Sequence, residues 1–480
     1  MSEYERQSAT LRKTKIVCTI GPSSNSSAVL KSLLQAGMNV ARINASHGTM
    51  EEHGEYVEIL RREAVKAKVP LAILLDLPGP KDRTGKVKKG GVKLREGMEY
   101  VLTTRDVLGN ESQVSVDLPD LPRHVKLGQA IFLDDGLIKL EVASISTDSV
   151  RCKVITGGRL GDNKGVSVPG VTWDTDAVTE EDWKHLEFVV KLGIDFVGLS
   201  FVSKAEDVMK VKDFLQQQGS ATKVIAKIER VEGLNNFDEI LETADGVMVA
   251  RGDLGVQIPI QKVPVVQKEL IRKCNHAGKP VIVATQMLES MVDSPVPTRA
   301  EATDVANAIF DGADAIMLSE ETAIGNYAVE TAKMMSLIAM EAEAALPYEE
   351  TFANKAKYLQ PLTDDAISYA ACHTAHQLGA KAVVAYTSSG STARRVSKYR
   401  PQTPILAITP DGETQRQLSL SWGVYAVRVS EAKSIINMFK QAAVAVRKFG
   451  LAEDGDLVVV TGGIPIGIPG TTNMLKVEKL

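Results

Sequence analysis

Residues Val224–Val256 have the sequence VIAKIERVEGLNNFDEILETADGVMVARGDLGV, and this stretch decides the fold of the chain. It begins with a short apolar, β-branched run, VIAKIE, and a second apolar run, GVMVA, follows at Gly246–Ala250. The residues between the two runs, LNNFDEILE, have the apolar spacing of a helix. The stretch therefore predicts two buried parallel strands joined by a helix, the unit from which parallel sheets are built.

Three charged side chains come at the carboxyl ends of these strands. Lys227 and Glu229 lie two residues apart and so on one face of the first strand, and Asp253 follows the second strand. Because adjacent parallel strands end side by side, we expect the three groups to converge. Two carboxylates suit a divalent cation such as Mg2+ or Mn2+, and a lysine beside it suits transfer of an anionic group. A buried salt bridge at a strand end is the structural alternative.

Six more apolar runs of the same kind are found before and after this stretch: Lys15–Ile20, Met38–Asn44, Leu71–Asp76, Phe196–Phe201, Val281–Thr285 and Ala315–Ser319. Between the third and fourth of the eight runs, residues 80–175 instead contain short alternating segments and turn residues, typical of a small β module. Removing that module from residues 1–345 leaves 249 residues, close to the ~250 of an eight-stranded barrel. The sequence predicts a (βα)8 TIM barrel with an inserted β domain; a doubly wound sheet is the alternative.

A second strand-helix series follows the barrel. An acidic, alanine-rich helix is predicted at Glu330–Ala345, then an irregular segment near Pro347–Pro361. Four strands are predicted after it, at Ala382–Tyr386, Pro404–Ile408, Val424–Val429 and Asp456–Thr461. We therefore expect a barrel domain at 1–79 and 176–345, an inserted β lid domain at 80–175, and a C-terminal α/β domain at 346–480.

Composition excludes several classes of function. The chain has 480 residues, 44% of them hydrophobic, and a net charge of −4, so neither nucleic acid nor an anionic membrane is an expected partner. The first residues, MSEYERQSATLRKTK, have no apolar core of a secretory signal, and no apolar run approaches the ~20 residues of a membrane span. Four scattered cysteines fit reduced thiols, and a cytoplasmic protein is predicted. A P-loop and a zinc-type Cys/His cluster are both absent from the sequence.

Other polar residues at strand ends extend the predicted site. Arg42 suits a phosphoryl group or carboxylate, and the oxygens of Asn44, Ser46 and Asp76 suit a cation. Consecutive backbone N–H groups at Gly252 and Asp253 suit a small carboxylate. The Thr285 hydroxyl either faces the same site or caps the following helix. Arg83 follows the proline turn after the third strand and is predicted to reach back over this site, and Lys164, in the GDNKG loop, suits a nucleotide phosphate.

A hydroxyl-rich turn in the C-terminal domain forms a second candidate site. It comprises Thr387, Ser388, Ser389, Gly390, Ser391 and Thr392, between a strand and a helix. Hydroxyls and a helix N-terminus suit a phosphate, and the tail GIPIGIPGTTN is predicted to close over it. A helix-capping turn is the structural alternative, although one hydroxyl suffices for a cap.

Nine motifs in order along the chain resemble those of pyruvate kinases. The motifs are RKTKIVCTIGPSS, GMNVARINASHG, LDLPGPKDRTG, NKGVSVPG, AKIER, VARGDLGV, GKPVIVATQMLESM, PTRAEATDVANAIFDGADAIMLSEETAIGNY and TSSGSTARRVSKYRP, and the resemblance as a whole runs from about Lys13 to Asn473. The resemblance implies transfer of a phosphoryl group from phosphoenolpyruvate to ADP in glycolysis. It also implies a mobile β lid, a C-terminal domain that binds a sugar-phosphate or nucleotide effector, and a homotetramer.

The resemblance also implies residue roles. Lys227 and Arg42 would stabilise the phosphoryl group, while Gly252, Asp253 and Thr285 would hold the substrate carboxylate. Glu229 and Asp253 would bind Mg2+. The nucleotide would contact Asn44, His47, Arg83 and Lys164, and a monovalent cation would lie at Asn44, Ser46, Asp76 and the Leu77 carbonyl. The enolate would take its proton from water or from Thr285.

The chain departs from the family pattern most clearly at Lys81, where potassium-dependent members carry glutamate. We expect the Lys81 ammonium to replace the charge of K+ near Asp76, so that K+ is dispensable; a solvent-exposed Lys81 is the alternative. Two rival functions stay open from the residues alone. A metal-dependent enolate lyase or aldolase would not need a nucleotide, and a sugar-phosphate sensor would not form pyruvate.

Overall fold

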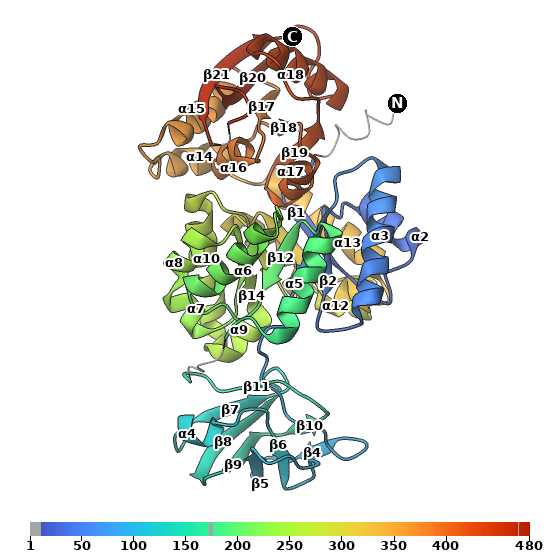
Figure 1. Cartoon of the computed structure of the whole chain (residues 1–480), viewed down its shortest axis with the longest axis vertical. Helices are drawn as coiled ribbons and strands as arrows, with labels where there is room; N and C mark the ends of the chain where they lie inside the picture. The colour runs from blue at the N-terminus through green and yellow to red at the C-terminus, as the bar shows by residue number, and fades with distance from the viewer. Residues whose placement is uncertain (1–10, 172–175, 469) are drawn as a thin grey trace.

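A computed structural model of the chain describes residues 11–171, 176–468 and 470–480, which form three regions stacked along the long axis (Figure 1). A barrel occupies the middle, with the C-terminal domain above it and the β module below it. Residues 1–10 lie outside the described residues. They make up most of the N-terminal segment in which the sequence predicts no secretory signal. Residues 172–175, at the end of the predicted lid domain, also lie outside the described residues.

Eight parallel strands close into one barrel, in which each strand pairs with the next along the chain and β16 pairs with β1. This closure confirms the predicted TIM barrel and excludes the doubly wound sheet, whose two edges would remain open. All eight strands lie within two residues of their predicted bounds. They are β1 (Lys15–Ile20), β2 (Val40–Asn44), β3 (Ala72–Asp76), β12 (Phe196–Leu199), β13 (Lys223–Ile228), β14 (Gly246–Ala250), β15 (Val281–Ala284) and β16 (Ala315–Leu318).

The helices surround this barrel because the strands are apolar on both faces. Residues such as Val40, Ile225 and Met317 fill its interior, while alternate residues pack outward against the helices. The principal helices are α2 (Ser27–Ala36), α3 (Met50–Ala67), α5 (Glu180–Leu192), α6 (Ala205–Gln217), α10 (Val263–Ala277), α11 (Arg299–Asp311) and α13 (Ala328–Ala344). The single helix predicted over LNNFDEILE is instead split at Asn236 into α7 (Val231–Asn235) and α8 (Phe237–Thr243); the Asn236 side chain donates to the Ser203 carbonyl at 2.8 Å.

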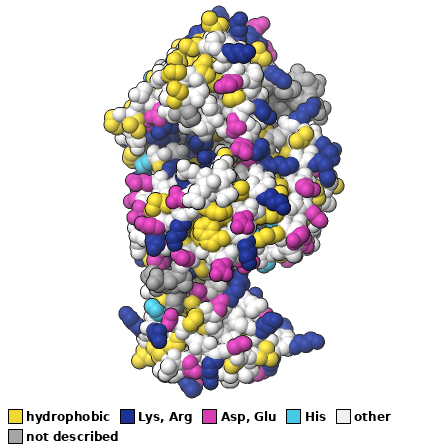
Figure 2. Space-filling view, in the orientation of Figure 1, with side chains coloured by type: hydrophobic (Ala, Val, Ile, Leu, Met, Phe, Trp, Pro, Cys, Tyr) yellow, Lys and Arg dark blue, Asp and Glu magenta, His cyan; other side chains and the backbone are white. Residues whose placement is uncertain are grey.

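The insertion after β3 is a β module, as predicted. Its larger sheet has the order β11-β7-β8-β9-β5-β6, and β10 pairs with β4. The strands are β4 (Val92–Leu94), β5 (Glu99–Thr103), β6 (Gln113–Ser115), β7 (Ala130–Leu133), β8 (Ile138–Ile145), β9 (Ser149–Thr156), β10 (Gly158–Leu160) and β11 (Val166–Ser167), with the short helix α4 (Leu121–His124). The surface narrows where this module joins the barrel (Figure 2).

The C-terminal domain contains a five-stranded sheet of order β19-β18-β17-β20-β21. Four strands match the prediction: β17 (Ala382–Tyr386), β18 (Ile405–Thr409), β19 (Val424–Arg428) and β20 (Leu457–Gly463). The fifth, β21 (Thr472–Lys479), was not predicted; it is an antiparallel edge strand with an apolar and polar mixture, NMLKVEK. The helices are α15 (Thr363–Gln377), α16 (Ser391–Lys398), α17 (Gly412–Gln417) and α18 (Ile435–Phe449).

The segment predicted to be irregular forms helix α14 (Tyr348–Ala356). Its first turn contains Glu349 and Glu350 and its last turn contains Lys355. Acidic residues at the N-terminus and a basic residue at the C-terminus interact favourably with the helix dipole and stabilise the helix. The prolines at Pro347 and Pro361 lie outside the helix, where they do not interrupt its hydrogen bonds. Within the described residues, no helix is long and apolar enough to cross a membrane.

Candidate active site

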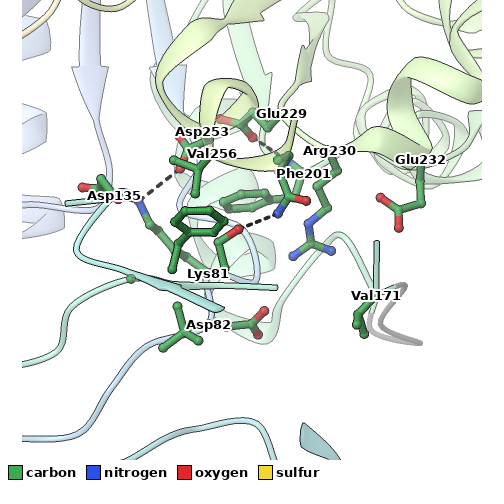
Figure 3. Close-up of a pocket in the computed structure, with 16 residues that line it drawn as sticks. Lys81, Asp82, Asp135, Val171, Phe201, Glu229, Arg230, Glu232, Asp253 and Val256 are labelled. Carbon is green, nitrogen blue, oxygen red and sulfur yellow. Dashed lines mark hydrogen bonds and ion pairs between the residues drawn. The ribbon is translucent and has the colours of Figure 1, made fainter. Parts of the chain in front are cut away.

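Two of the charged residues predicted at strand ends, Glu229 and Asp253, line a pocket at the carboxyl ends of the barrel strands, where the β module faces the barrel (Figure 3). The barrel contributes Phe201, Glu229, Arg230 and Asp253 to the lining, and the β module contributes Asp135. Glu229 and Asp253 follow adjacent strands, β13 and β14, so strand pairing places their carboxylates in one pocket. We call this end of the barrel the barrel mouth.

Lys227 lies in a buried network beside this pocket. Its Nζ is 3.0 Å from Oε1 of Glu229 and 3.0 Å from Oδ1 of Asp76, and it donates to the Ser200 hydroxyl at 2.6 Å. Burial alone lowers the pKa of Lys227, but Asp76 and Glu229 raise it by more, so the pKa lies above its ordinary value. Lys227 is therefore a fixed cation at neutral pH, suited to neutralising charge and unsuited to acting as a base.

Glu229 and Asp253 fit a divalent cation. Glu229 is 1% exposed, and its Oε2 accepts a hydrogen bond from the Phe201 N–H at 2.7 Å. Burial raises the pKa of Glu229, Lys227 lowers it and Asp253 raises it again, for a net rise above the ordinary value. A cation shared by the two carboxylates would relieve this repulsion. Since the described residues hold no cluster of three or more metal-ligating side chains, water or phosphate oxygens would complete the coordination, as Mg2+ prefers.

Lys81 links the barrel to the β module. Its Nζ lies 3.2 Å from Oδ1 of Asp253 and 3.0 Å from Oδ1 of Asp135, as Figure 3 shows. Burial lowers the pKa of Lys81, but Asp253 and Asp135 raise it by more, so the pKa is raised overall. The expected position beside Asp76 is therefore not observed, and the alternative of a free solvent-exposed ammonium is not observed either. The reason is local: after β3 the chain turns at Gly79, whose φ is +64°, toward the module.

The Asp76 carboxylate forms ion pairs with two basic side chains, Arg42 and Lys227. Its Oδ2 is 2.7 Å from Nε of Arg42 and its Oδ1 faces Lys227; Arg42 also donates to the Thr19 hydroxyl at 2.9 Å. Burial raises the pKa of Asp76, but Lys227 and Arg42 lower it by more, so the carboxylate stays ionised. The Leu77 carbonyl accepts from the Ser200 hydroxyl at 2.6 Å. These oxygens of the predicted monovalent-cation site already have partners.

The other two groups of that predicted site lie at the carboxyl end of β2, Asn44 as its last residue and Ser46 two residues beyond it. The Asn44 side-chain oxygen accepts from the Ser46 N–H at 3.3 Å, so the two residues form a local turn. His47 follows them, is exposed, and its carbonyl lies 2.8 Å from Nε2 of His53. Asn44, Ser46 and His47 therefore lie together where β2 ends and the following loop begins.

Gly252 and Thr285 are in direct contact at the ends of β14 and β15. The Thr285 hydroxyl accepts from the Gly252 N–H at 2.8 Å and donates to the Ala284 carbonyl at 2.6 Å. Thr285 has φ +71°, a strained conformation for a β-branched residue, of the kind found at functional sites. Thr285 caps no described helix, so that alternative is excluded. The Gly252 N–H, expected to be available for a carboxylate, is engaged by Thr285.

Arg83 and Lys164 lie on the β module and have partners there. Arg83 donates to the Asn163 carbonyl at 3.0 Å, and Nζ of Lys164 lies 2.8 Å from Oδ1 of Asp134. Backbone pairing of Arg83 with Gly165 keeps the two cations on neighbouring segments. They therefore form a pair whose position relative to the barrel depends on the position of the module.

The hydroxyl-rich turn Thr387–Thr392 is only partly open. Ser389 donates to the Ser391 hydroxyl at 3.3 Å, whereas Thr392 is buried with its hydroxyl 2.7 Å from that of Thr472, in the tail that was expected to cover the turn. Arg394 donates to the Ser389 carbonyl at 3.0 Å and adds a cation that was not predicted. An anion here would meet Ser389, Ser391 and Arg394, while Thr392 contributes to packing.

Sequence reasoning also missed three residues at the barrel mouth. Ser200 joins Lys227 to the Leu77 carbonyl, Asp135 holds Lys81, and Arg230 donates to the Pro80 carbonyl at 3.1 Å while lying 4.8 Å above the Phe201 ring. Ser200 could have been found from its position directly after β12. Asp135 gave no signal because it lies in a turn of the inserted module, far from the strands that define the barrel.

Comparisons with known proteins agree with this geometry. A family model described as the pyruvate kinase barrel domain matches residues 11–332, and one described as the pyruvate kinase alpha/beta domain matches residues 365–478. A pyruvate kinase of Staphylococcus aureus (strain MRSA252) is 46% identical over 470 residues, which cover 98% of this chain and 80% of that protein. A pyruvate kinase of Geobacillus stearothermophilus is 48% identical over 470 residues, covering 97% of this chain and 80% of that protein.

Proposed function

The chain belongs to the pyruvate kinase family and is a phosphotransferase, and we propose that its barrel mouth is where phosphoenolpyruvate and ADP react. The observation that carries this proposal is the buried Lys227 ammonium, 3.0 Å from both Asp76 and Glu229. Its charge is held in place by protein carboxylates before any substrate binds. Cationic groups fixed in advance stabilise the charge on a phosphoryl group in transfer at little reorganisation cost.

Lys227 and Arg42 would bind the phosphoryl oxygens. The bond from phosphorus to the enol oxygen breaks as a bond to a β-phosphate oxygen of ADP forms, and the enolate then takes a proton to give pyruvate. The Lys227 ammonium has three N–H donors, and its neighbours are Asp76, Glu229 and Ser200. A phosphoryl oxygen must therefore replace one neighbour, and the neutral Ser200 hydroxyl is the one displaced at least electrostatic cost.

The end of the site near Thr285 would hold the carboxylate of the substrate. The backbone N–H of Asp253 lies beside the Gly252 N–H that Thr285 already engages. The Thr285 hydroxyl is then close to the enolate carbon and is a candidate donor of its proton, with water as the other. Backbone donors and one hydroxyl bind a carboxylate without adding net charge, so the strongest cationic charge stays on the phosphoryl end.

Glu229 and Asp253 would hold Mg2+ or Mn2+, which when bound neutralises charge on the phosphate oxygens and orients them. For the monovalent cation, we propose that K+ is dispensable. Arg42 and Lys227 already supply positive charge at Asp76, and Lys81 adds a third cation at Asp253. This differs from a direct replacement of K+ by Lys81, because Lys81 contacts Asp253 rather than Asp76.

The β module, residues 80–175, would act as a lid over the nucleotide. Arg83 and Lys164 on the module and Asn44 and His47 on the barrel would contact ADP from opposite sides. The Lys81 bridge between Asp253 and Asp135 already joins the two parts. Closure excludes water from the transferring phosphoryl group and so prevents its hydrolysis.

Two further features extend the proposal to regulation and assembly. A sugar phosphate or nucleotide would bind at Thr387–Thr392 and activate the barrel, supported by the Ser389 and Ser391 hydroxyls and the adjacent Arg394. The chain would work in the cytoplasm as a homotetramer, which light scattering of the purified protein tests.

Pyruvate formation in a coupled assay tests the central proposal. We expect turnover that requires phosphoenolpyruvate, ADP and Mg2+ together. Turnover without a nucleotide would favour a lyase, and no pyruvate under any of these conditions would favour a sensor. Either result would contradict the function proposed for this site.

A further inference from the structure

A second cavity, of about 250 Å³, lies between the barrel and the C-terminal domain. Its barrel wall includes Arg272 and His276 near the carboxyl end of α10, and Phe310 at that of α11. Because barrel helices run opposite to the strands, this wall is at the amino ends of the strands, away from the barrel mouth. Helix α14 forms another wall, at the junction visible in Figure 1. The proposed reaction uses none of these residues.

Arg400 lines this cavity, and two of its hydrogen-bond donors are buried without a partner among the described residues. It is 6% exposed, and its Nη2 donates at 2.8 Å to both the Gly312 carbonyl and Oδ2 of Asp314. Its Nε and Nη1 are buried and have no hydrogen-bond partner among the described residues. A buried donor without an acceptor costs free energy, and the cost is larger when the donor belongs to a charged group such as a guanidinium. An acceptor bound in the cavity would remove this cost.

The cavity is also short of negative charge. Lys355 lines it and, among the described residues, donates to the neutral Asn275 side chain alone, at 2.9 Å. The nearby acids have their own partners: Asp314 pairs with Arg400, Asp311 with Lys268, and Asp365 with Lys398 through both oxygens. Burial, and then Arg400 and Lys398, lower the pKa of Lys355 to about 7, although Asp314 opposes this.

Aromatic rings line the same cavity. The His276 and Tyr358 rings are in contact, with centroids 3.7 Å apart and planes tilted by 30°, and the Arg400 guanidinium carbon lies 4.9 Å from the centroid of the Trp422 ring. Tyr348 and Phe310 complete the aromatic lining. Flat side chains of this kind favour a flat ligand, because stacking adds to apolar burial only when the planes align.

We propose that this cavity binds a small oxyanion, a phosphate or a carboxylate, attached to a single planar ring. The anion would accept from Arg400 and Lys355, since a guanidinium offers parallel donors to such groups. The ring would stack among Tyr358, His276 and Trp422. The site is separate from both the barrel mouth and the Thr387–Thr392 turn, and because its walls come from two domains, an occupant contacts both.

Calorimetric titration of the full chain with phenyl phosphate tests this site. We expect one phenyl phosphate per chain, with binding that persists in saturating phosphoenolpyruvate. Lys355→Met should weaken it by at least about tenfold, the effect of losing a hydrogen bond to a charged group. Lys357→Met is the matched control, because Lys357 is on the same segment and pairs with Asn354, and it should change binding by less than about twofold.

Three other ligands and a second variant complete the test. Inorganic phosphate and phenol should each bind at least about fivefold more weakly than phenyl phosphate, and benzoate should compete with it. Arg400→Met should also abolish binding, with circular dichroism confirming that the variant is folded; if Arg400→Met does not fold, the titration of Lys355→Met decides alone. Any one of three results would overturn the proposal. These are phenyl phosphate binding that Lys355→Met leaves unchanged, binding that phosphoenolpyruvate displaces, and binding that is lost in Ser389→Glu. If phenol binds as tightly as phenyl phosphate, the site does not recognise the anion. If inorganic phosphate binds as tightly as phenyl phosphate, the site does not recognise the aromatic ring.

Discussion

Replacing Lys227 with methionine removes one ammonium group from the most buried part of the active site while nearly conserving side-chain volume. The almost fully buried side chains of Asp76 and Glu229 then lose a partner 3.0 Å away. Asp76 keeps Arg42, but Glu229 keeps only the Phe201 N–H. Removing one member of a buried ion pair costs about 3–5 kcal/mol, so we expect a loss of that order in the free energy of unfolding at pH 8.

This loss should depend on pH. The pKa of Glu229 is already raised by burial, although Lys227 opposes the rise, and without Lys227 it should rise further. A carboxyl group whose pKa is raised in the folded state favours folding below its unfolded pKa, and this contribution is lost as pH rises through the folded pKa. The destabilisation caused by Lys227→Met should therefore be smaller at pH 5 than at pH 8.

Two measurements check this reasoning. Thermal unfolding followed by circular dichroism from pH 5 to 8 measures stability, and the coupled assay measures turnover, expected to fall by at least about 10²–10³. Lys223→Met is the control, since Lys223 lies on the same strand at its opposite, partly exposed end. Turnover within a few-fold of wild type would refute the role of Lys227. Wild-type stability at pH 8, or an equal loss at every pH, would refute the ion-pair energetics.

Three further predictions concern cations and the effector. Lys81→Met should bind Mn2+ about fivefold more tightly by electron paramagnetic resonance, because the ammonium 3.2 Å from Asp253 competes with the metal; unchanged or weaker binding would contradict this. The wild type should be nearly fully active in tetramethylammonium buffer without K+, and Lys81→Glu should acquire a K+ requirement; a steep rise of wild-type activity on adding K+ at constant ionic strength argues against it. Ser389→Glu should abolish calorimetric binding of sugar phosphates by charge repulsion, and in the wild type phosphoenolpyruvate should tighten that binding by the factor by which the effector tightens substrate binding. Effector binding that survives Ser389→Glu would show that the turn is not the site.

Local pattern was sufficient for the barrel. A strand buried on both faces needs a continuous apolar run, and eight such runs defined the eight strands even though the β module interrupts the series after the third. The pattern of apolar residues was insufficient to predict a strand with one exposed face or a short helix. Strand β21 mixes polar and apolar residues, and α14 lies between prolines, so neither gives a clear period.

The sequence by itself also determined which charged residues reach the barrel mouth, because a position at the carboxyl end of a parallel strand fixes where a side chain starts. The sequence did not determine which groups these side chains contact. Lys81 contacts Asp253 instead of Asp76, and Thr285 engages the Gly252 N–H, because these contacts join segments far apart in the chain. The unpaired donors of Arg400 arise in the same way, from the packing of one domain against another. Strand periodicity is a local property of the chain, whereas burial, ion pairing and cavities are set only when distant segments pack together.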